Sequence, residues 1–284
     1  MNNESILGGL DPEVLETMAS RRDALRGAGR WATGLAFASV PLALAGMARN
    51  AFAQTGLPQA VVDVLNFALT LEELEAEFYV MGVNAAGLIP ASDRQIFTTI
   101  RDHEVAHVQF LRNALGSAAV AKPTFDFTAG GAFAPFTDYE QFKALSQAFE
   151  DTGVRAYKGQ APALLVSKPV LRAALTIHSV EARHASEVRR LRGNFTDQEP
   201  QQGWITLNLR GTGMPAATQP VYDGEENITQ AGINISTLPS VGTGATIGAN
   251  QASESFDEPL TREQVLMIVD PFIVGDVDGD GTEG

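Results

Sequence analysis

The sequence predicts an all-α fold built around a four-helix bundle. Three observations support this prediction: four long segments carry helical start and stop signals, one long connection separates the second from the third, and a Glu-x-x-His motif occurs twice. The chain has 284 residues, of which 44% are hydrophobic, so it can bury one sizeable core. We expect three parts, residues 1–53, 54–193 and 194–284.

Residues 1–53 have the layout of a secretory signal peptide. Arg21-Arg22 precedes an apolar run over residues 31–48, and Ala51-Phe52-Ala53 follows as a small-x-small cleavage pattern. The adjacent arginines resemble a twin-arginine export signal. We therefore expect an exported protein, periplasmic or extracellular, from which this segment is removed. The alternative is an uncleaved membrane anchor, which the short apolar run, interrupted by Pro41, disfavours.

The four helices of the bundle are expected within residues 54–193. They should run from about residue 57 to 83, 92 to 115, 138 to 160 and 167 to 192. The first and fourth have a proline in the first turn, Ser92 is a suitable N-cap for the second, and a glycine or proline follows the end of each helix. Short links join the first helix to the second and the third to the fourth, so each pair should be antiparallel. Residues 117–137 form the long connection, whose length allows a crossover along the bundle.

Residues 194–284 are expected to form a mostly irregular C-terminal extension. They are rich in Gly, Thr, Asn, Gln and Pro, and they show no sustained hydrophobic period. A short helix is predicted near residues 261–270, where Thr261 is a suitable N-cap with Gln264 three residues later. We therefore expect the extension to wrap around the bundle and to end in this helix.

Charge and cysteine content exclude several classes of protein. Acidic residues outnumber basic ones by 34 to 20, which gives a net charge of −14 and argues against nucleic acid or an anionic membrane surface as a partner. The chain has no cysteine, so zinc fingers, iron–sulfur clusters, thiol catalysis and disulfides are excluded. Any metal site must therefore use carboxylates and imidazoles.

Two Glu-x-x-His motifs supply such groups. Glu104 and His107 lie on the second predicted helix, and Glu181 and His184 lie on the fourth. Residues three apart lie about one turn apart on one helix face, so each pair can bind the same ion. One such pair is common by chance, whereas two pairs on helices of one bundle indicate a shared site.

The first and third helices add one carboxylate each. Glu72 and Glu150 are each followed seven residues later by a tyrosine, Tyr79 and Tyr157, which lies on the same helix face. Glu72 also sits in an apolar stripe, where an ionised carboxylate is unfavourable unless a cation pairs with it. The sequence therefore predicts two similar helical hairpins that together hold two metal ions through six ligands: Glu72, Glu104, His107, Glu150, Glu181 and His184.

Other polar residues are expected near these ligands. Tyr79, Tyr157 and His178 are expected to orient the ligands from outside, and His178 could instead be an additional ligand. His103 is expected to be a surface or packing residue. Glu73, Glu75 and Glu77 are expected to be solvated. The helix face around Glu150 is more polar than the face around Glu72, which predicts either more access for water on that side or a different helix register.

The ligand pattern resembles that of the ferritin-like di-iron and di-manganese carboxylate proteins, in which two helices give one Glu each and two give Glu-x-x-His. The resemblance covers residues 57–192 and all six ligand positions. The segments 69–79 and 256–263 are similar to those of exported ferritin-like proteins related to desiccation-associated proteins. The resemblance implies a ferritin-like bundle with the long crossover between helices two and three.

This donor set suits two Fe or two Mn ions, with iron slightly favoured. The first functional hypothesis is redox chemistry with O2 or peroxide, of a ferroxidase or a peroxidase- or catalase-like kind, in stress protection. The alternative is a non-enzymatic protein of structural or desiccation-stress type in which the ions only stabilise the fold. Iron storage is a weaker third hypothesis, since nothing in the sequence shows a cage interface. The sequence does not decide between a monomer and a homo-oligomer.

Overall fold

A computed structural model of the chain describes residues 56–193 and 202–275. All of these residues belong to one compact unit, Met47–Gly284. The expected signal peptide, residues 1–53, lies outside the described residues. Within the described ranges, no helix combines the length and the apolar character needed to cross a membrane.

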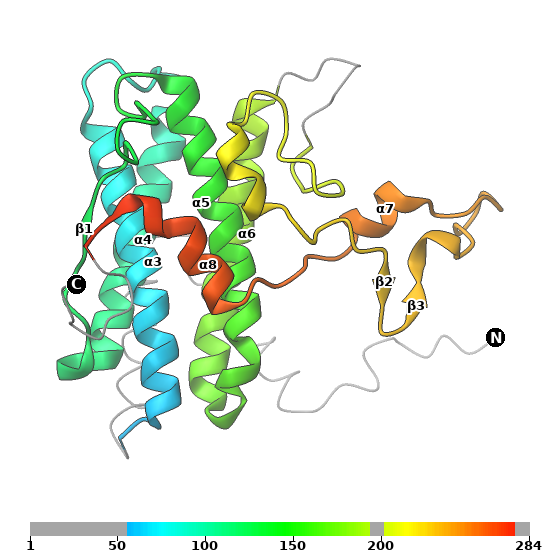
Figure 1. The fold of residues 1–284 in the computed structure, drawn as a ribbon, viewed down its shortest axis with the longest axis horizontal. Coiled ribbons are helices and arrows are strands. Elements are labelled where there is room, and N and C mark those ends of the chain that lie inside the picture. Colours follow the sequence, from blue (N-terminus) through cyan, green and yellow to red (C-terminus); the bar gives the residue numbers. More distant parts are fainter. Residues whose placement is uncertain (1–55, 194–201, 276–284) are drawn as a thin grey trace, which may run out of the picture. The chain divides into compact units, whose positions relative to one another are not determined.

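The described residues confirm the predicted all-α architecture (Figure 1). Four long helices form the bundle: α3 (Gln59–Asn84), α4 (Arg94–Leu115), α5 (Tyr139–Gln160) and α6 (Lys168–Arg192). α3 packs along α4, and α5 packs along α6, so the chain forms two helical hairpins that meet mainly through α3 and α5. Only nine residues, 85–93, join α3 to α4.

The long connection between α4 and α5 is the predicted crossover. It contains a 3-10 turn, η2 (Gly116–Ala118), and a two-residue strand, β1 (Thr124–Phe125). Between α5 and α6 lies another 3-10 segment, η3 (Ala161–Val166). α4 ends where Gly116 takes a positive φ of 56°, a conformation that favours glycine.

α5 begins at a side-chain cap, whereas α4 begins without one. The Asp138 side chain accepts hydrogen bonds from the backbone N–H groups of Glu140 and Gln141, which caps α5. α4 begins at Arg94, with Asp93 and not the expected Ser92 at its N-cap position. The Asp93 carboxylate makes no capping bond and instead accepts a hydrogen bond from the Tyr139 hydroxyl at 2.6 Å.

An aromatic cluster fixes the distance between the two hairpins. The rings of Phe78 in α3 and Phe142 in α5 stack with centroids 5.0 Å apart. Gly82 permits this approach, because a Cβ atom at that position would lie 2.2 Å from the Phe142 ring. α3 and α5 therefore pass close together near one end of α3, and this contact sets the spacing of the polar residues farther along both helices.

The C-terminal extension is mostly irregular, as predicted, and contains short elements. These are η4 (Ala216–Val221), β2 (Thr229–Gln230), β3 (Ile233–Asn234), η5 (Ile235–Thr237), α7 (Ala249–Glu254), α8 (Arg262–Val269), η6 (Asp270–Phe272) and β4 (Ile273–Val274). The predicted capping box of α8 is present, with reciprocal bonds between Thr261 and Gln264. β2 pairs with β3, and β4 pairs antiparallel with β1, so the described extension ends in a strand and not in the helix.

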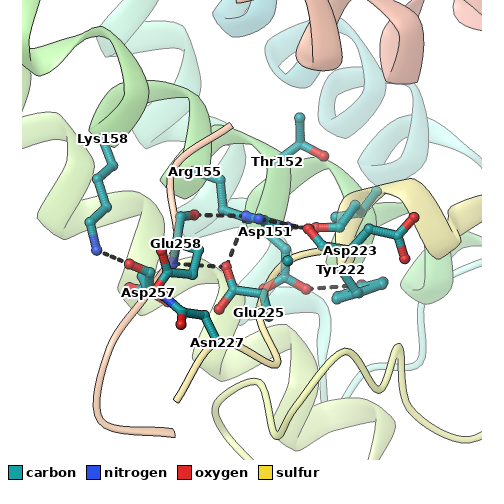
Figure 2. A network of polar contacts seen from close by, with 12 residues as sticks. Asp151, Thr152, Arg155, Lys158, Tyr222, Asp223, Glu225, Asn227, Asp257 and Glu258 are labelled. Carbon is teal, nitrogen blue, oxygen red and sulfur yellow. Dashed lines mark hydrogen bonds and ion pairs between the residues drawn. The ribbon is translucent and has the colours of Figure 1, made fainter. Parts of the chain in front are cut away.

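The extension packs on α5, which it contacts through η4 and α8 (Figure 1). The buried Arg155 of α5 holds it most extensively. Its guanidinium donates to the backbone carbonyls of Val221, Asp223 and Glu258 and pairs with Glu225 at 2.8 Å (Figure 2). Distant parts of the extension therefore converge on one side chain of the bundle.

The polar face of α5 is buried, and the expectation of greater water access on the Glu150 side is wrong. Lys143, Ser146 and Gln147 are all buried, as is Glu150. The physical reason is the extension: the Gln147 amide donates to the Arg210 carbonyl and to the Tyr222 hydroxyl. The polar residues of this face are therefore partners for a covering segment, and the helix register is as predicted.

Candidate metal centre

The structure brings the six predicted ligand residues together between the four helices. α3 contributes Glu72, α4 contributes Glu104 and His107, α5 contributes Glu150, and α6 contributes Glu181 and His184. The four glutamates are 0% exposed, and the two histidines are 6% and 5% exposed. Such a concentration of buried carboxylates is unfavourable without positive charge among them.

One half of the site is centred on His107. Its Nδ1 atom lies 3.1 Å from Glu72 Oε2, 3.2 Å from Glu104 Oε2 and 3.1 Å from Glu181 Oε1. A single ring N–H can donate to only one or two acceptors, so three carboxylate oxygens at this distance exceed what the imidazole can satisfy. The donors converge on a point that suits a cation.

The other half is centred on His184. Its Nδ1 atom lies 2.9 Å from Glu104 Oε1, 3.2 Å from Glu150 Oε2 and 3.7 Å from Glu181 Oε2. All four of these atoms are buried and without a hydrogen-bond partner. The contacts between them are therefore short but do not have hydrogen-bond geometry. Buried polar atoms without partners are rare, and a metal ion is one of the explanations for them.

Glu104 and Glu181 belong to both halves. Each half offers four ligand atoms that all lie within 4.8 Å of one another. Glu104 directs Oε2 to the first half and Oε1 to the second, while Glu181 directs Oε1 to the first and Oε2 to the second. These two carboxylates therefore connect the two groups, and each turns one oxygen to either group.

The donor spacing also fits metal ions. Neighbouring donors around an octahedral ion with bonds of about 2.1 Å are about 3.0 Å apart. The contacts of the two imidazole nitrogens fall mostly between 2.9 and 3.2 Å. The chemistry and the spacing of these donors therefore fit the binding of metal ions.

Two tyrosines hold the glutamates of the opposite hairpin. The Tyr79 hydroxyl of α3 donates to Glu150 Oε1 at 2.5 Å, and the Tyr157 hydroxyl of α5 donates to Glu72 Oε1. In each glutamate the other oxygen, Oε2, faces a histidine. Each tyrosine thus fixes the carboxylate so that one oxygen stays directed at the centre.

The electrostatics describe the metal-free protein. Burial raises the pKa of Glu72 to about 8 and the pKa of Glu150 well above its usual range. Burial would also raise the pKa of Glu104, but His107 and His184 hold it below its usual range. Burial lowers the pKa of His107, but Glu72 and Glu104 outweigh this and raise it well above its usual range. The buried cluster therefore holds protons, and a metal ion that bound there would have to displace them.

His103 contacts the site, although the sequence pattern places it on the surface or in packing. Its side chain is exposed, yet its Nδ1 atom lies 2.9 Å from Nε2 of His184, and the two rings stack with centroids 5.2 Å apart. His184 thus has a partner on its remote nitrogen, which fixes the orientation of a ligating imidazole. A signal for this contact exists in the sequence, because His103 and His107 are four residues apart and share a helix side.

The expectation that Glu73 and Glu75 are solvated is also wrong. Both are buried, since α3 is covered on nearly all sides by α4, α5 and η3. Glu73 pairs with Arg112 at 2.5 Å. Glu75 lies beside α5, where a Cβ atom on Gly153 would be 3.2 Å from its Oε1 atom. Glu77 is partly exposed and pairs with Lys122, as a residue at the edge of the bundle can.

His178 does not join either half of the site. It is half-buried, and neither four-residue group includes it. Burial lowers its pKa below the usual range, with opposing influences from Asp257 and Lys158. The predicted role in orienting the ligands therefore has no contact to support it within the described residues.

Comparison with known proteins agrees with this geometry. Residues 60–194 match the family model described as a ferritin-like domain, a range that contains all six ligand positions. No curated protein matches the chain. The bundle formed by α3 to α6 is thus supported as a member of the ferritin-like superfamily.

Proposed function

We propose that this chain binds two Fe or two Mn ions, and that the loaded centre reacts with O2 or peroxide. This reaction would protect the compartment to which the protein is exported. The observation that carries this proposal is the pair of four-residue groups that share Glu104 and Glu181. A structural site for one ion needs no shared carboxylates, whereas two ions close together need bridging negative charge between them.

The donors favour iron and manganese over softer metals. They are carboxylate oxygens and imidazole nitrogens, and the chain has no cysteine to offer sulfur. When bound, a pair of Fe or Mn ions supplies two-electron chemistry toward O2 or peroxide. Iron is slightly favoured between the two metals, on ligand chemistry alone.

The chain's own residues position and shield such a centre. Tyr79 and Tyr157 direct one oxygen of Glu150 and one of Glu72 toward it. Both tyrosine hydroxyls stay protonated near neutral pH, because burial raises their pKa well above the usual range. All six proposed ligands are buried, so bulk water is excluded from the centre. His103 connects the remote nitrogen of His184 to the protein surface.

Export belongs to the same proposal. The paired arginines and the cleavage pattern in residues 1–53 support a twin-arginine route, which carries folded proteins. On that route the ions are loaded in the cytoplasm before transport. Redirecting the chain to a route for unfolded proteins and measuring its metal content tests this point, since an unchanged content would contradict it.

A non-enzymatic role is the second candidate. The six proposed ligands come from all four helices, so bound ions would tie the whole bundle together. A metal-stabilised structural protein of the desiccation-associated kind would need no more than this. A large fall in Tm on chelation without any turnover of O2 or peroxide would favour this role over the redox role.

The deciding experiment is elemental analysis of the native protein combined with a visible spectrum before and after peroxide. We expect two Fe or two Mn per chain, a spectral change on peroxide addition, and repeated turnover. Two bound ions without turnover would leave only the structural role. A chain that binds neither metal would contradict both roles. Size-exclusion chromatography separates a monomer from a homo-oligomer or a storage cage.

A further inference from the structure

A polar cleft lies between the bundle and the C-terminal extension. It consists of two adjoining cavities of about 220 Å³ and 660 Å³, and Arg189, Trp204 and Glu254 line both of them. Residues of α5 and α6 line the smaller cavity on the bundle side, while the extension lines both cavities. The larger one has the volume of a small-molecule site. None of the six proposed metal ligands lines either cavity, so the cleft is separate from the candidate metal centre.

Trp204 lies where the two cavities meet. It is the only tryptophan among the described residues, and it is 53% exposed. A Cβ atom on Gly203 would lie 2.9 Å from Ser186 Oγ, so the glycine lets the extension pass close to α6 just before Trp204. The indole therefore has a fixed place beside α6 with about half of its surface uncovered. A flat apolar ring in a polar cleft offers a stacking surface to a ligand.

The chain that follows Trp204 is held in a strained conformation. Leu207 takes a φ of 49°, in the left-handed region that is unfavourable for a leucine. Its N–H donates to Ser253 Oγ at 2.9 Å, and the nearby Thr206 hydroxyl donates to Glu254 Oε1 at 2.6 Å. These two bonds tie one wall of the cleft to α7. Strained backbone of this kind is often found at ligand sites, where the surroundings hold it in place.

Side-chain amides line the larger cavity. The Gln219 amide donates to the Asn208 carbonyl and to Asp223 Oδ1, both at 3.0 Å, and its oxygen accepts from Arg210 at 2.9 Å. These bonds fix the orientation of Gln219. The side-chain amides of Asn208 and Asn250, in contrast, make no hydrogen bond to any residue that the structure describes. Each can both donate to and accept from a ligand.

The charges of the cleft disfavour an anionic ligand. Asp151 neutralises Arg189 through two hydrogen bonds, and Arg210 shares the larger cavity with the carboxylates of Asp223 and Glu254. An extended peptide is disfavoured as well, because none of the four described strands lines either cavity and so none offers a sheet edge. The lining instead matches a neutral ligand with many hydroxyl groups. Amides and carboxylates can exchange hydrogen bonds with those hydroxyls, and the C–H face of a sugar ring can stack on an indole.

We propose that this cleft binds a neutral carbohydrate, with one pyranose ring stacked on Trp204 and hydroxyl groups hydrogen-bonded by Asn208 and Asn250. The inference goes beyond the proposed function, since binding requires neither the metal ions nor their ligands. It gives the C-terminal extension a role of its own, in addition to covering α5.

The test is a titration of the full chain with three neutral disaccharides: maltose, cellobiose and N,N′-diacetylchitobiose. Inorganic phosphate and trialanine serve as the anionic and peptide comparisons. Trp31→Phe leaves Trp204 as the only tryptophan of the chain, so its fluorescence reports directly on the cleft. We expect calorimetry to show saturable binding of at least one disaccharide below about 10 mM, together with a change in Trp204 emission. Phosphate and trialanine should show no saturable binding.

Variants then locate the binding site. Trp204→Ala should lower the affinity for that disaccharide by about 10- to 30-fold, and Trp204→Phe, which keeps a stacking ring, by less. Val241→Ala is the matched control, because Val241 is a fully exposed apolar residue of the same extension that lines neither cavity. It should leave the affinity unchanged. All three variants should keep the Tm and the Mn(II) binding of the wild type, which separates a lost contact from a lost fold.

Three results would overturn the inference while leaving the proposed metal centre intact. The first is the absence of saturable binding for all three disaccharides. The second is equal disaccharide affinity in Trp204→Ala and wild type, which would place the carbohydrate elsewhere on the protein. The third is saturable binding of phosphate or trialanine alone, which would assign the cleft to an anion or a peptide.

Discussion

The two hairpins of the bundle make the same ion pair in different surroundings. Glu73 pairs with Arg112 in the α3–α4 hairpin, and Asp151 pairs with Arg189 at the matching positions of the α5–α6 hairpin. The Arg112 side chain is 37% exposed, whereas that of Arg189 is 3% exposed. The extension causes the difference, because Tyr222 donates to Asp151 at 3.0 Å and lies over Arg189.

This difference shows that the ligand pattern repeats while the surroundings do not. Where α3 presents Leu69, α5 presents Gln147 at the equivalent position, and the extension supplies the hydrogen-bond partners of Gln147. The polar extension therefore closes the α5 side of the candidate centre. Its removal should expose that half of the site and leave the α3–α4 half covered.

The largest expected effect comes from breaking the two matched ion pairs. Arg189→Ala leaves Asp151 buried without its cation and should lower the free energy of unfolding by about 3–5 kcal/mol. Arg112→Ala should lower it by about 1–3 kcal/mol, because water can reach the vacated position. Urea unfolding of both variants at one pH measures the two values. Equal losses would mean that the extension does not set the surroundings of these pairs.

Variants of Tyr79 and Tyr157 test whether the two halves of the site bind metal with similar affinity. Tyr157→Phe frees Glu72, and Tyr79→Phe frees Glu150, so each variant should weaken metal binding by about 10- to 100-fold. The effects should be similar in size, because each hydroxyl holds the glutamate of the opposite hairpin. Calorimetric titration with Mn(II) measures both. A loss in only one variant would show that the two halves bind their ions with unequal strength.

The sequence predicts most of this architecture because helical periodicity is a local property. Residues three or seven apart share a helix face, so spacing alone places Glu104 with His107, and Glu72 with Tyr79. The crossover follows from the length of one connection. The crossing of each tyrosine to the glutamate of the other hairpin cannot be derived in this way, because it depends on how α3 lies against α5.

The hydrophobic pattern of the sequence does not predict which side chains are buried by distant segments. The extension has no hydrophobic period, so its composition does not indicate that it covers Gln147 or that its carbonyls converge on Arg155. The acidic neighbours of Glu75 suggest that it is solvated, although the space it occupies depends on Gly153 in another helix. Periodicity shows which residues share a face and leaves open what covers that face.

The metal-free protein should lose stability as pH rises from 6.5 to 8. Folding raises the pKa of Glu72 from 4.5 to about 8, and it raises the pKa of His107 and His184 above 6.5. The folded state then holds more protons than the unfolded state in this window, so stability falls with rising pH. Glu104 and Glu181, whose pKa values are lowered, are ionised in both states here and add no slope.

The urea midpoint in the presence of a chelator checks this prediction at the two pH values. We expect a lower midpoint at pH 8, by less than the shift for Arg189→Ala. Protein loaded with metal should show little change or the opposite trend, since bound ions replace the protons. A midpoint that rises with pH in the chelated protein would contradict the assignment of these protons to the centre.

The smallest expected effect separates the two histidine ligands. His184 has the imidazole partner His103 on its remote nitrogen, whereas the polar contacts of His107 among the described residues all involve Nδ1, the nitrogen that faces the glutamates. His103→Ala should weaken binding of the ion next to His184 by about tenfold, because that ring loses the contact that orients it. His178→Ala is the control, since His178 belongs to neither ligand group. A two-step titration with Mn(II) should show one step weakened and one unchanged, and a uniform loss in both steps would instead indicate a general effect of His103 on the fold.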